Sequence, residues 1–440
     1  MADALKVLQT IAIDLLDSAA ILAFLLVGLV WIAVIDRKVT QSLILEPARR
    51  GADLPELLDR LTFSLRLYLR GLLTRDAGRF LPWLASIISV ASGTVAFAAL
   101  SFGPAVHLAN LNTGLVFIFG ASFLGIHGGV LARGFSVRAA SLAGLARNAM
   151  RVAGFEAAAA LALISGVILA GSISMTRIVQ AQMDQGAWFF FLAPLGFLLF
   201  LASSIAGIDS ASRPTIRAPR AVLEQEQNPD EAPAQFQWPF GSLGASIHLL
   251  IGAGLATTVF LGGWLRPFAS YHDHFAGTPV ELLDALPPLT AAAAVGYCLW
   301  LASREEDPGR RQLMKITSGV CAGLCMILTG VLFASAPALA ALHGAFWFLA
   351  KMAAYIYAFL WLRARIPQFR FGRPIRAAWN FLIPLSAINA VGVAAALVAC
   401  ERWDWSPALS TFVMTLIALG IAAWLALHDA SETPTYSLEP

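Results

Sequence analysis

Long apolar runs separated by short polar stretches constrain the fold of this chain more than any other feature. About eleven of these runs approach the roughly 20 residues that a helix needs to cross a bilayer. They span residues 15–35, 80–102, 114–132, 152–174, 188–207, 242–264, 285–303, 316–339, 345–362, 381–400 and 409–427. Only 13% of the residues are charged, against about a quarter in soluble domains. Since no strand pattern is visible, these features predict an all-α, polytopic membrane protein.

Basic residues alternate between the loops, and this alternation predicts the orientation of the chain. The odd-numbered loops contain clusters of arginine and lysine, whereas each even-numbered loop contains at most one such residue. Because cytoplasmic loops carry the excess of basic residues, we expect the N-terminus outside and the C-terminus in the cytoplasm. The first residues have neither a basic n-region nor a small-residue cleavage site, so we expect no removable signal.

Two polar features lie on the predicted cytoplasmic side. In residues 53–73, leucines recur at helical spacing with arginines elsewhere around the helix, which predicts an amphipathic helix in the membrane interface. Residues 209–239 form the most polar run of the chain and include Arg217, Glu224 and Glu226. This run is either a plain connector or a place where a charged or protonated molecule is handled.

Two ionisable residues inside apolar runs are functional candidates, because such groups are costly in a membrane. Glu156 lies near the start of the run 152–174, where Arg147 and Arg151 would hold it ionised or pair with it for structure. Lys351 lies midway through the run 345–362, with a stem long enough to reach an interface.

Other candidates for metal or cofactor chemistry are weak. His127 and His248 each stand alone in an apolar run, which favours a hydrogen-bonded structural histidine over a ligand. The H-x-H at 272–274 lacks further ligands nearby, and Cys321 and Cys325 have no histidine or carboxylate beside them. We therefore expect no metal site. The net charge of +3 also gives no reason to expect nucleic-acid binding.

Several motifs are similar to those of one family. FWFLAK (346–351), LRARIP (362–367), the R-x-x-W from Arg376 and the later Pro-Leu and Asn389 follow its pattern, as does FLGGWLRP at 260–267. GLARNAMRVAGFE (144–156) and IDRKV (35–39) are further matches. Together these motifs resemble the H subunit of NADH-quinone oxidoreductase, or respiratory complex I. The resemblance covers most of residues 12–267 and 344–390.

This resemblance implies a core of about eight transmembrane helices with one interfacial amphipathic helix, so that this chain would carry three extra helices. It also implies that the cytoplasmic loops form the entrance and floor of a quinone chamber, where a proton-translocation path begins. The chain would be a subunit only and would oxidise nothing alone. Quinone would be a substrate. Iron–sulfur clusters and FMN would reside in partner subunits of a complex in a bacterial inner (plasma) membrane.

Individual roles carried over from the family fall on matching positions. Glu156, Glu224 and Glu226 are the expected catalytic carboxylates. The expected quinone-chamber and helix-end residues are Asp36, Arg37, Arg147, Arg217, Lys351, Arg363, Arg370 and Arg376.

Four departures from the family pattern keep a second interpretation open. Ala221, Asn228, Gln237 and Ala245 stand where the family has acids, and none of them can exchange a proton. The alternative is a structural anchor in a membrane-bound hydrogenase or related ion-translocating complex, without its own quinone site. An independent transporter is less favoured, since no internal repeat is visible.

The resemblance also divides the chain into four segments. Residues 1–284 would hold the first six helices and the chamber loops, and 285–339 an inserted helix pair. Residues 340–400 would hold the last two core helices, and 401–440 an extra helix and a tail.

Overall fold

The computed structural model describes residues 24–26, 28, 29, 32, 80–103, 111–136, 142–212, 238–267, 336–365, 377–403 and 420. Within these ranges the regular structure is helical, as the sequence predicts. In chain order the elements are α3 (Phe80–Ala98), α4 (Gly114–Ser136), α5 (Leu142–Ala170), α6 (Met175–Asp184), α7 (Phe189–Leu192), α8 (Pro194–Ser212), α10 (Trp238–Phe260), α13 (Ala336–Arg365), the π-helix η5 (Ala377–Leu382) and α15 (Ile383–Trp403).

The described helices have the length and composition of a polytopic membrane protein. Among them, the segments long and apolar enough to cross a membrane are Gly114–Ala132, Ala143–Ala170, His343–Arg363 and Ala378–Trp403. Shorter apolar segments are Leu84–Ala98, Pro194–Ile208 and Gly244–Phe260. The predicted total of about eleven spans also counts runs outside the described ranges. The amphipathic helix predicted at 53–73 lies outside them as well.

Helix α5 begins earlier than its hydropathy predicts. It starts at Leu142, whereas the apolar run begins at 152, because LAGLARNAMR is rich in good helix formers despite its arginines. Hydropathy detects only the apolar part of a helix, so it does not detect the polar turns with which α5 begins. Glu156 therefore lies near the middle of α5, whereas the sequence suggested a position near the start of the helix.

Two further boundaries differ from the predicted ones, and one helix was not predicted. The run 188–207 is divided, because Ala193 leaves the helical conformation at φ −134 and Pro194 begins α8. The separate runs 316–339 and 345–362 imply a break at 340–344, and this expectation is wrong, since α13 is continuous through these residues. The short helix α6 was not predicted. Its buried residues Met175, Ile178, Val179 and Gln182 follow helical spacing, but ten residues are too few to stand out by hydropathy.

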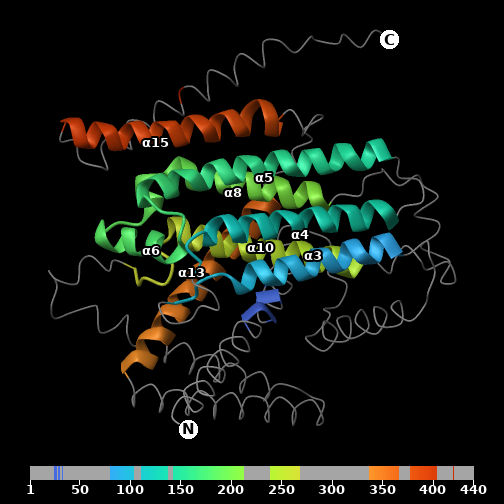
Figure 1. The fold of residues 1–440 in the computed structure, drawn as a ribbon, viewed down its shortest axis with the longest axis horizontal. Helices are drawn as coiled ribbons and strands as arrows, with labels where there is room; N and C mark the ends of the chain where they lie inside the picture. The colour runs from blue at the N-terminus through green and yellow to red at the C-terminus, as the bar shows by residue number, and fades with distance from the viewer. Residues whose placement is uncertain are drawn as a thin grey trace.

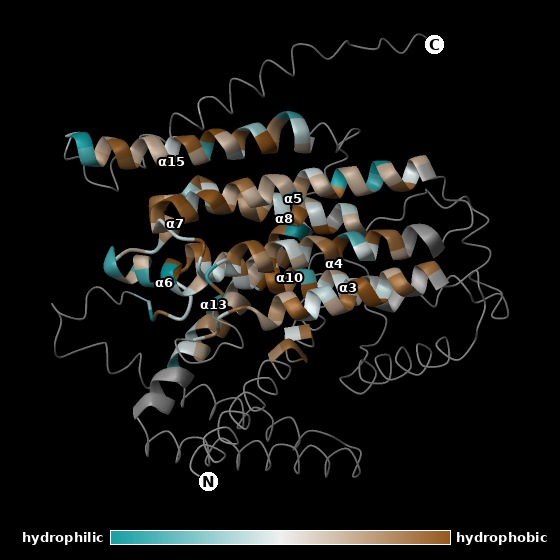
Figure 2. Ribbon diagram, viewed as in Figure 1, coloured by the Kyte–Doolittle hydropathy of each residue, from teal (hydrophilic) through white to brown (hydrophobic). Residues whose placement is uncertain are grey.

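Helix α10 occupies the centre of the bundle. It is apolar on all sides and contacts α3, α4, α5, α6, α7, α8 and α13, as expected of a helix surrounded by others. Helices α3, α4, α5 and α8 run side by side around it, and α6 lies at one end of the bundle (Figure 1). In Figure 2 the bundle helices are mostly apolar brown, while hydrophilic residues gather on α6 and toward helix ends.

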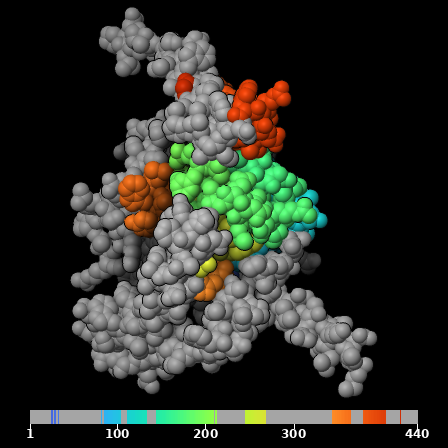
Figure 3. All heavy atoms as spheres, turned by 90° about the vertical axis from the view of Figure 1, so that its left-hand side faces the viewer, coloured from blue at the N-terminus to red at the C-terminus, as the bar shows by residue number. Residues whose placement is uncertain are grey.

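Small residues allow the helices to approach closely. A Cβ placed on Gly128 of α4 would lie 3.0 Å from the main-chain oxygen of Ala85 on α3, and one on Gly166 of α5 would lie against Val259 of α10. Such contacts are typical of helix pairs in membranes, where burial of apolar surface gives little drive to associate. Helix α15 packs on α5 at the edge of the bundle, as Figures 1 and 3 both show.

Candidate functional site

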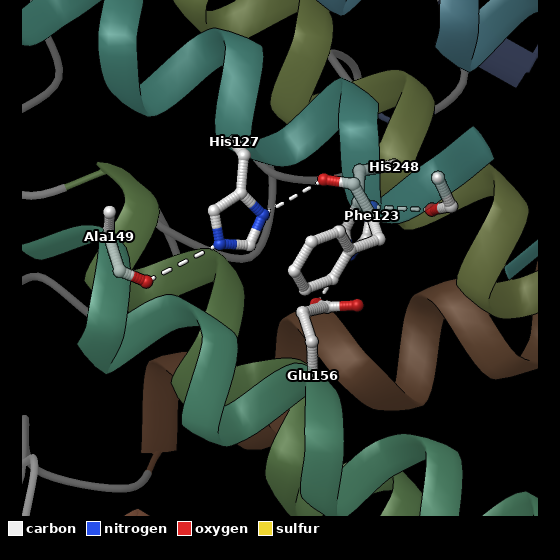
Figure 4. A network of polar contacts seen from close by, with 6 residues as sticks. Phe123, His127, Ala149, Glu156 and His248 are labelled. Atoms are coloured by element: carbon white, nitrogen blue, oxygen red, sulfur yellow. Dashed lines mark hydrogen bonds and ion pairs between the residues drawn. The ribbon is translucent and has the colours of Figure 1, made fainter. Parts of the chain in front are cut away.

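Three polar side chains from three helices meet in the apolar interior. The Nε2 atom of His248 on α10 lies 3.1 Å from Oε1 of Glu156 on α5. On the other side of the same ring, Nδ1 lies 2.7 Å from the hydroxyl oxygen of Ser122 on α4. Glu156 is 4% exposed and His248 9%. We refer to Ser122, His248 and Glu156 as the buried triad; Figure 4 shows its histidine and carboxylate.

The triad lies halfway along its helices. Glu156 is fourteen residues from the first residue of α5, which is roughly 21 Å along the axis. His248 is ten residues into α10, roughly 15 Å from its start. An ionisable pair at this depth is far from both ends of an apolar bundle, and its hydrogen bonds in the structure come from neighbouring side chains.

The surroundings of Glu156 are tight. Gly207 of α8 faces it, since a Cβ added there would lie 3.5 Å from Oε1. Phe155 and Val152 of the same helix are fully buried. In these surroundings a hydrogen bond is electrostatically stronger than in water, and losing one partner would leave a costly unpaired group. The site can therefore hold a shared proton between an imidazole and a carboxylate.

His127 does not belong to the triad. Its Nδ1 lies 2.9 Å from the main-chain oxygen of Phe123, and its Nε2 lies 3.3 Å from that of Ala149 (Figure 4). The ring joins α4 to α5 through main-chain groups alone. The prediction of a hydrogen-bonded histidine is therefore confirmed for His127, whose partners are main-chain oxygens, while His248 contacts an ionisable side chain.

A second buried polar cluster closes the C-terminal end of α10. The Nζ atom of Lys351 donates to the main-chain oxygens of Leu261 at 2.7 Å and Gly263 at 3.1 Å, and also to that of Leu265. The same ammonium lies 4.5 Å from the centre of the Trp188 ring, within cation–π range.

Gln182 of α6 completes this cluster. Its Nε2 donates to the oxygen of Thr258 at 2.9 Å, and its Oε1 accepts from the amides of Gly262 at 2.9 Å and Phe189 at 3.1 Å. In a continuing helix, residue 262 would bond directly to Thr258. Here the side-chain amide stands between them, so the chain can turn away through Gly262 and Gly263, whose φ values are +75 and +53. We call Gln182, Trp188 and Lys351 with residues 257–265 the α10 end cluster.

The structure separates residues that the sequence grouped. Lys351 lies at the end of α10 opposite Trp238, and roughly 15 Å or more along the axis from His248. Residues 213–237, the part of the polar run 209–239 that lies outside the described residues, precede Trp238 in the chain and are called the polar stretch 213–237 below. Arg147 is exposed, nine residues before Glu156 on α5, and Arg363 lies near the end of α13. The other predicted site residues lie outside the described residues: Asp36, Arg37, Arg217, Glu224, Glu226, Arg370 and Arg376.

Sequence reasoning missed two functional candidates. His248 was interpreted as a lone histidine, because nothing in the sequence shows that α5 and α10 bring it to Glu156. Gln182 passed unnoticed, although it takes an apolar position in the 175, 178, 179 and 182 pattern of α6. No group of three or more His, Cys, Asp or Glu side chains that could hold a metal ion occurs among the described residues.

Comparisons with known proteins identify the family. The family model described as NADH dehydrogenase matches residues 16–394. The second NADH-quinone oxidoreductase H subunit of Solibacter usitatus (strain Ellin6076) is 31% identical over 373 residues, covering 84% of this chain and 90% of that protein. The first H subunit of Koribacter versatilis (strain Ellin345) is 28% identical over 344 residues, 75% of this chain and 79% of that protein. The chain with the buried triad thus belongs to the H-subunit family of NADH-quinone oxidoreductase and is a membrane subunit of respiratory complex I.

Proposed function

We propose that this subunit couples quinone reduction to proton translocation, with Glu156 as the membrane-embedded carboxylate of the path. The observation that carries the proposal is the burial of Glu156 at mid-depth with its carboxylate on His248. An ionisable group is costly there, and a merely structural bond would be made more cheaply by neutral side chains. Family membership supplies the partners, which are the other subunits of complex I.

In this proposal the polar stretch 213–237 forms the floor of the quinone chamber. Arg217, Glu224 and Glu226 polarise the chamber as the reduced quinone takes up protons. The stretch lies between α8 and α10 in the chain, so a charge change on it adjoins the helix that carries His248. The chain supplies no cofactor chemistry: electrons reach the quinone from clusters of partner subunits, in a bacterial inner membrane with the N-terminus outside.

Glu156→Gln tests the proposal, because glutamine keeps the hydrogen-bonding shape but cannot titrate. The variant complex is compared with wild type in proteoliposomes for NADH-dependent quinone reduction and for protons moved per electron. Since a positioned proton-transfer group contributes about 100-fold or more, we expect coupled turnover to fall at least tenfold. Glu401→Gln is the matched control, since Glu401 is exposed at the end of α15. Full turnover with an unchanged proton yield in Glu156→Gln would refute the proposal.

One observation favours the structural anchor as a second candidate. Ala245 lies on α10 one turn before His248, where the family resemblance leads us to expect a glutamate. A subunit that had lost its proton path would show such replacements. The anchor predicts that Glu156→Gln changes the amount of assembled complex but neither quinone reduction per complex nor proton yield.

A further inference from the structure

Ala245, where the family resemblance leads us to expect a glutamate, and the buried His248 lie on one face of α10. Ala245 and His248 are three residues apart, so their side chains point to the same side of the helix with an axial offset of about 4.5 Å. A carboxylate at 245 would stand one turn nearer to the polar stretch 213–237 than the imidazole does. Position 245 thus holds no titratable group, and His248 lies one turn farther along the same face.

The triad can gain a proton without losing a hydrogen bond. With one proton on the imidazole, Nε2–H donates to the ionised Glu156 and Nδ1 accepts from the Ser122 hydroxyl. With a second proton, Nδ1–H donates and the Ser122 hydroxyl turns to accept. A serine hydroxyl serves in either sense, whereas a main-chain carbonyl at the same place would accept only. This contrasts with His127, whose ring contacts two carbonyl oxygens.

We propose that His248 is the proton-exchange partner of Glu156 and takes over the role of the carboxylate absent at Ala245. The inference rests on the proposed function of Glu156 and adds the residue through which protons reach it. In the step itself, the proton on Nε2 moves across the 3.1 Å contact to Oε1 of Glu156. The ring begins this step as an imidazolium and ends it as a neutral imidazole, because Nδ1 keeps the second proton, and the ionised Glu156 becomes neutral. No other bond changes.

A further buried hydroxyl lies against α10 between the start of that helix and the triad. Ser89 of α3 is buried, its Oγ lies against Gly244 of α10, and this oxygen has no hydrogen-bond partner among the described residues. Gly244 lies one turn before His248 on α10, so Ser89 contacts this helix between the triad and the start of α10, which follows the stretch 213–237. A buried hydroxyl without a hydrogen-bond partner is costly, and its presence there fits a hydrated route into the triad.

The test uses the intact complex in proteoliposomes and four variants. His248→Asn keeps a hydrogen-bonding side chain but cannot titrate, and we expect proton translocation to fall at least about tenfold. His248→Asn combined with Ala245→Glu restores a titratable group on the same face, and we expect it to recover at least half of the wild-type proton yield. His127→Asn is the matched control and should keep the wild-type yield. Glu156→Gln is measured beside them.

The outcomes separate this inference from the proposed function. If Glu156→Gln loses proton translocation while His248→Asn keeps it, the role of His248 is refuted and that of Glu156 stands. If both variants keep it, the proposed function fails. If His248→Asn loses translocation and Ala245→Glu does not restore it, although the complex assembles, His248 is a structural support of Glu156 and the exchange role is refuted.

Discussion

Replacing Gln182 with leucine should loosen one end of the bundle selectively. Leucine has a similar volume, so it fills the space but removes three good hydrogen bonds to the main chain at 2.9, 2.9 and 3.1 Å. The amides of Gly262 and Phe189 and the oxygen of Thr258 lose their partner in buried surroundings. An orphaned buried group costs about 1–3 kcal/mol, and three at the lower part of this range cost about 4 kcal/mol.

Local opening of α6 can be measured by trypsin, because Arg177 is exposed on this helix. When cleavage is slower than reclosing, its rate follows the population of the open form. A cost of about 4 kcal/mol raises that population roughly a thousandfold, so cleavage of the purified complex at Arg177 should accelerate by about 100-fold or more.

Gln180→Leu is the control for this experiment. It is the same substitution two residues earlier, on the exposed side of α6, where the amide contacts Asp184 at 2.9 Å. An exposed i,i+4 pair is worth only about 0.2–0.5 kcal/mol, so its cleavage rate should stay within about threefold of wild type. If Gln182→Leu were cleaved no faster than Gln180→Leu, the α10 end cluster would not hold α6 in place and the reasoning would be refuted.

Three other substitutions test the remaining features. Lys351→Met should reduce heat resistance of quinone reductase activity but leave protons per electron unchanged, and a changed ratio would show a role in the proton path. Gly262→Ala forces an L side chain to φ +75 against the Trp188 indole, and should lower the inactivation temperature, whereas Gly252→Ala, with nothing within 4 Å of its Cβ, should not. Ser122→Ala removes the hydroxyl that can donate to or accept from Nδ1 of His248, and should slow proton translocation about three- to tenfold. Ser122→Thr keeps a hydroxyl and should retain the rate.

The fold class was predictable from the sequence because lipid leaves few solutions for the backbone. Apolar runs near 20 residues imply helices, and α3 and α4 begin at the residues where their runs begin. The ends of α5 and α13 were not predictable from hydropathy, because their polar or small residues, such as Arg147 and Gly344, remain helical. Because hydropathy does not detect the polar first turns of α5, it placed Glu156 near a helix end, although Glu156 lies near the middle of the helix.

The site was half predictable. Glu156 could be singled out, because a lone carboxylate in an apolar run is costly and therefore conspicuous. Its partner could not, since His248 is 92 positions away and the pairing depends on how α5 and α10 cross. Lys351 was conspicuous for the same reason as Glu156, yet its ammonium bonds to main-chain oxygens that no sequence pattern marks. The cost of burying an ionisable side chain identifies candidate residues from the sequence, but only the packing of the helices shows which groups each side chain contacts.

The α10 end cluster fixes one end of the central helix α10, so that the helix can tilt about that end. Lys351 and Gln182 hold the residues after Phe260, while the opposite end at Trp238 adjoins the polar stretch 213–237. Because rise along a helix is uniform, a sideways displacement of Trp238 about this pivot reaches His248 at roughly half its amplitude. The hydrogen bonds of the triad tolerate only a few tenths of an ångström before they weaken. A shift of about 1 Å at Trp238 would thus be enough to make or break the contact between His248 and Glu156.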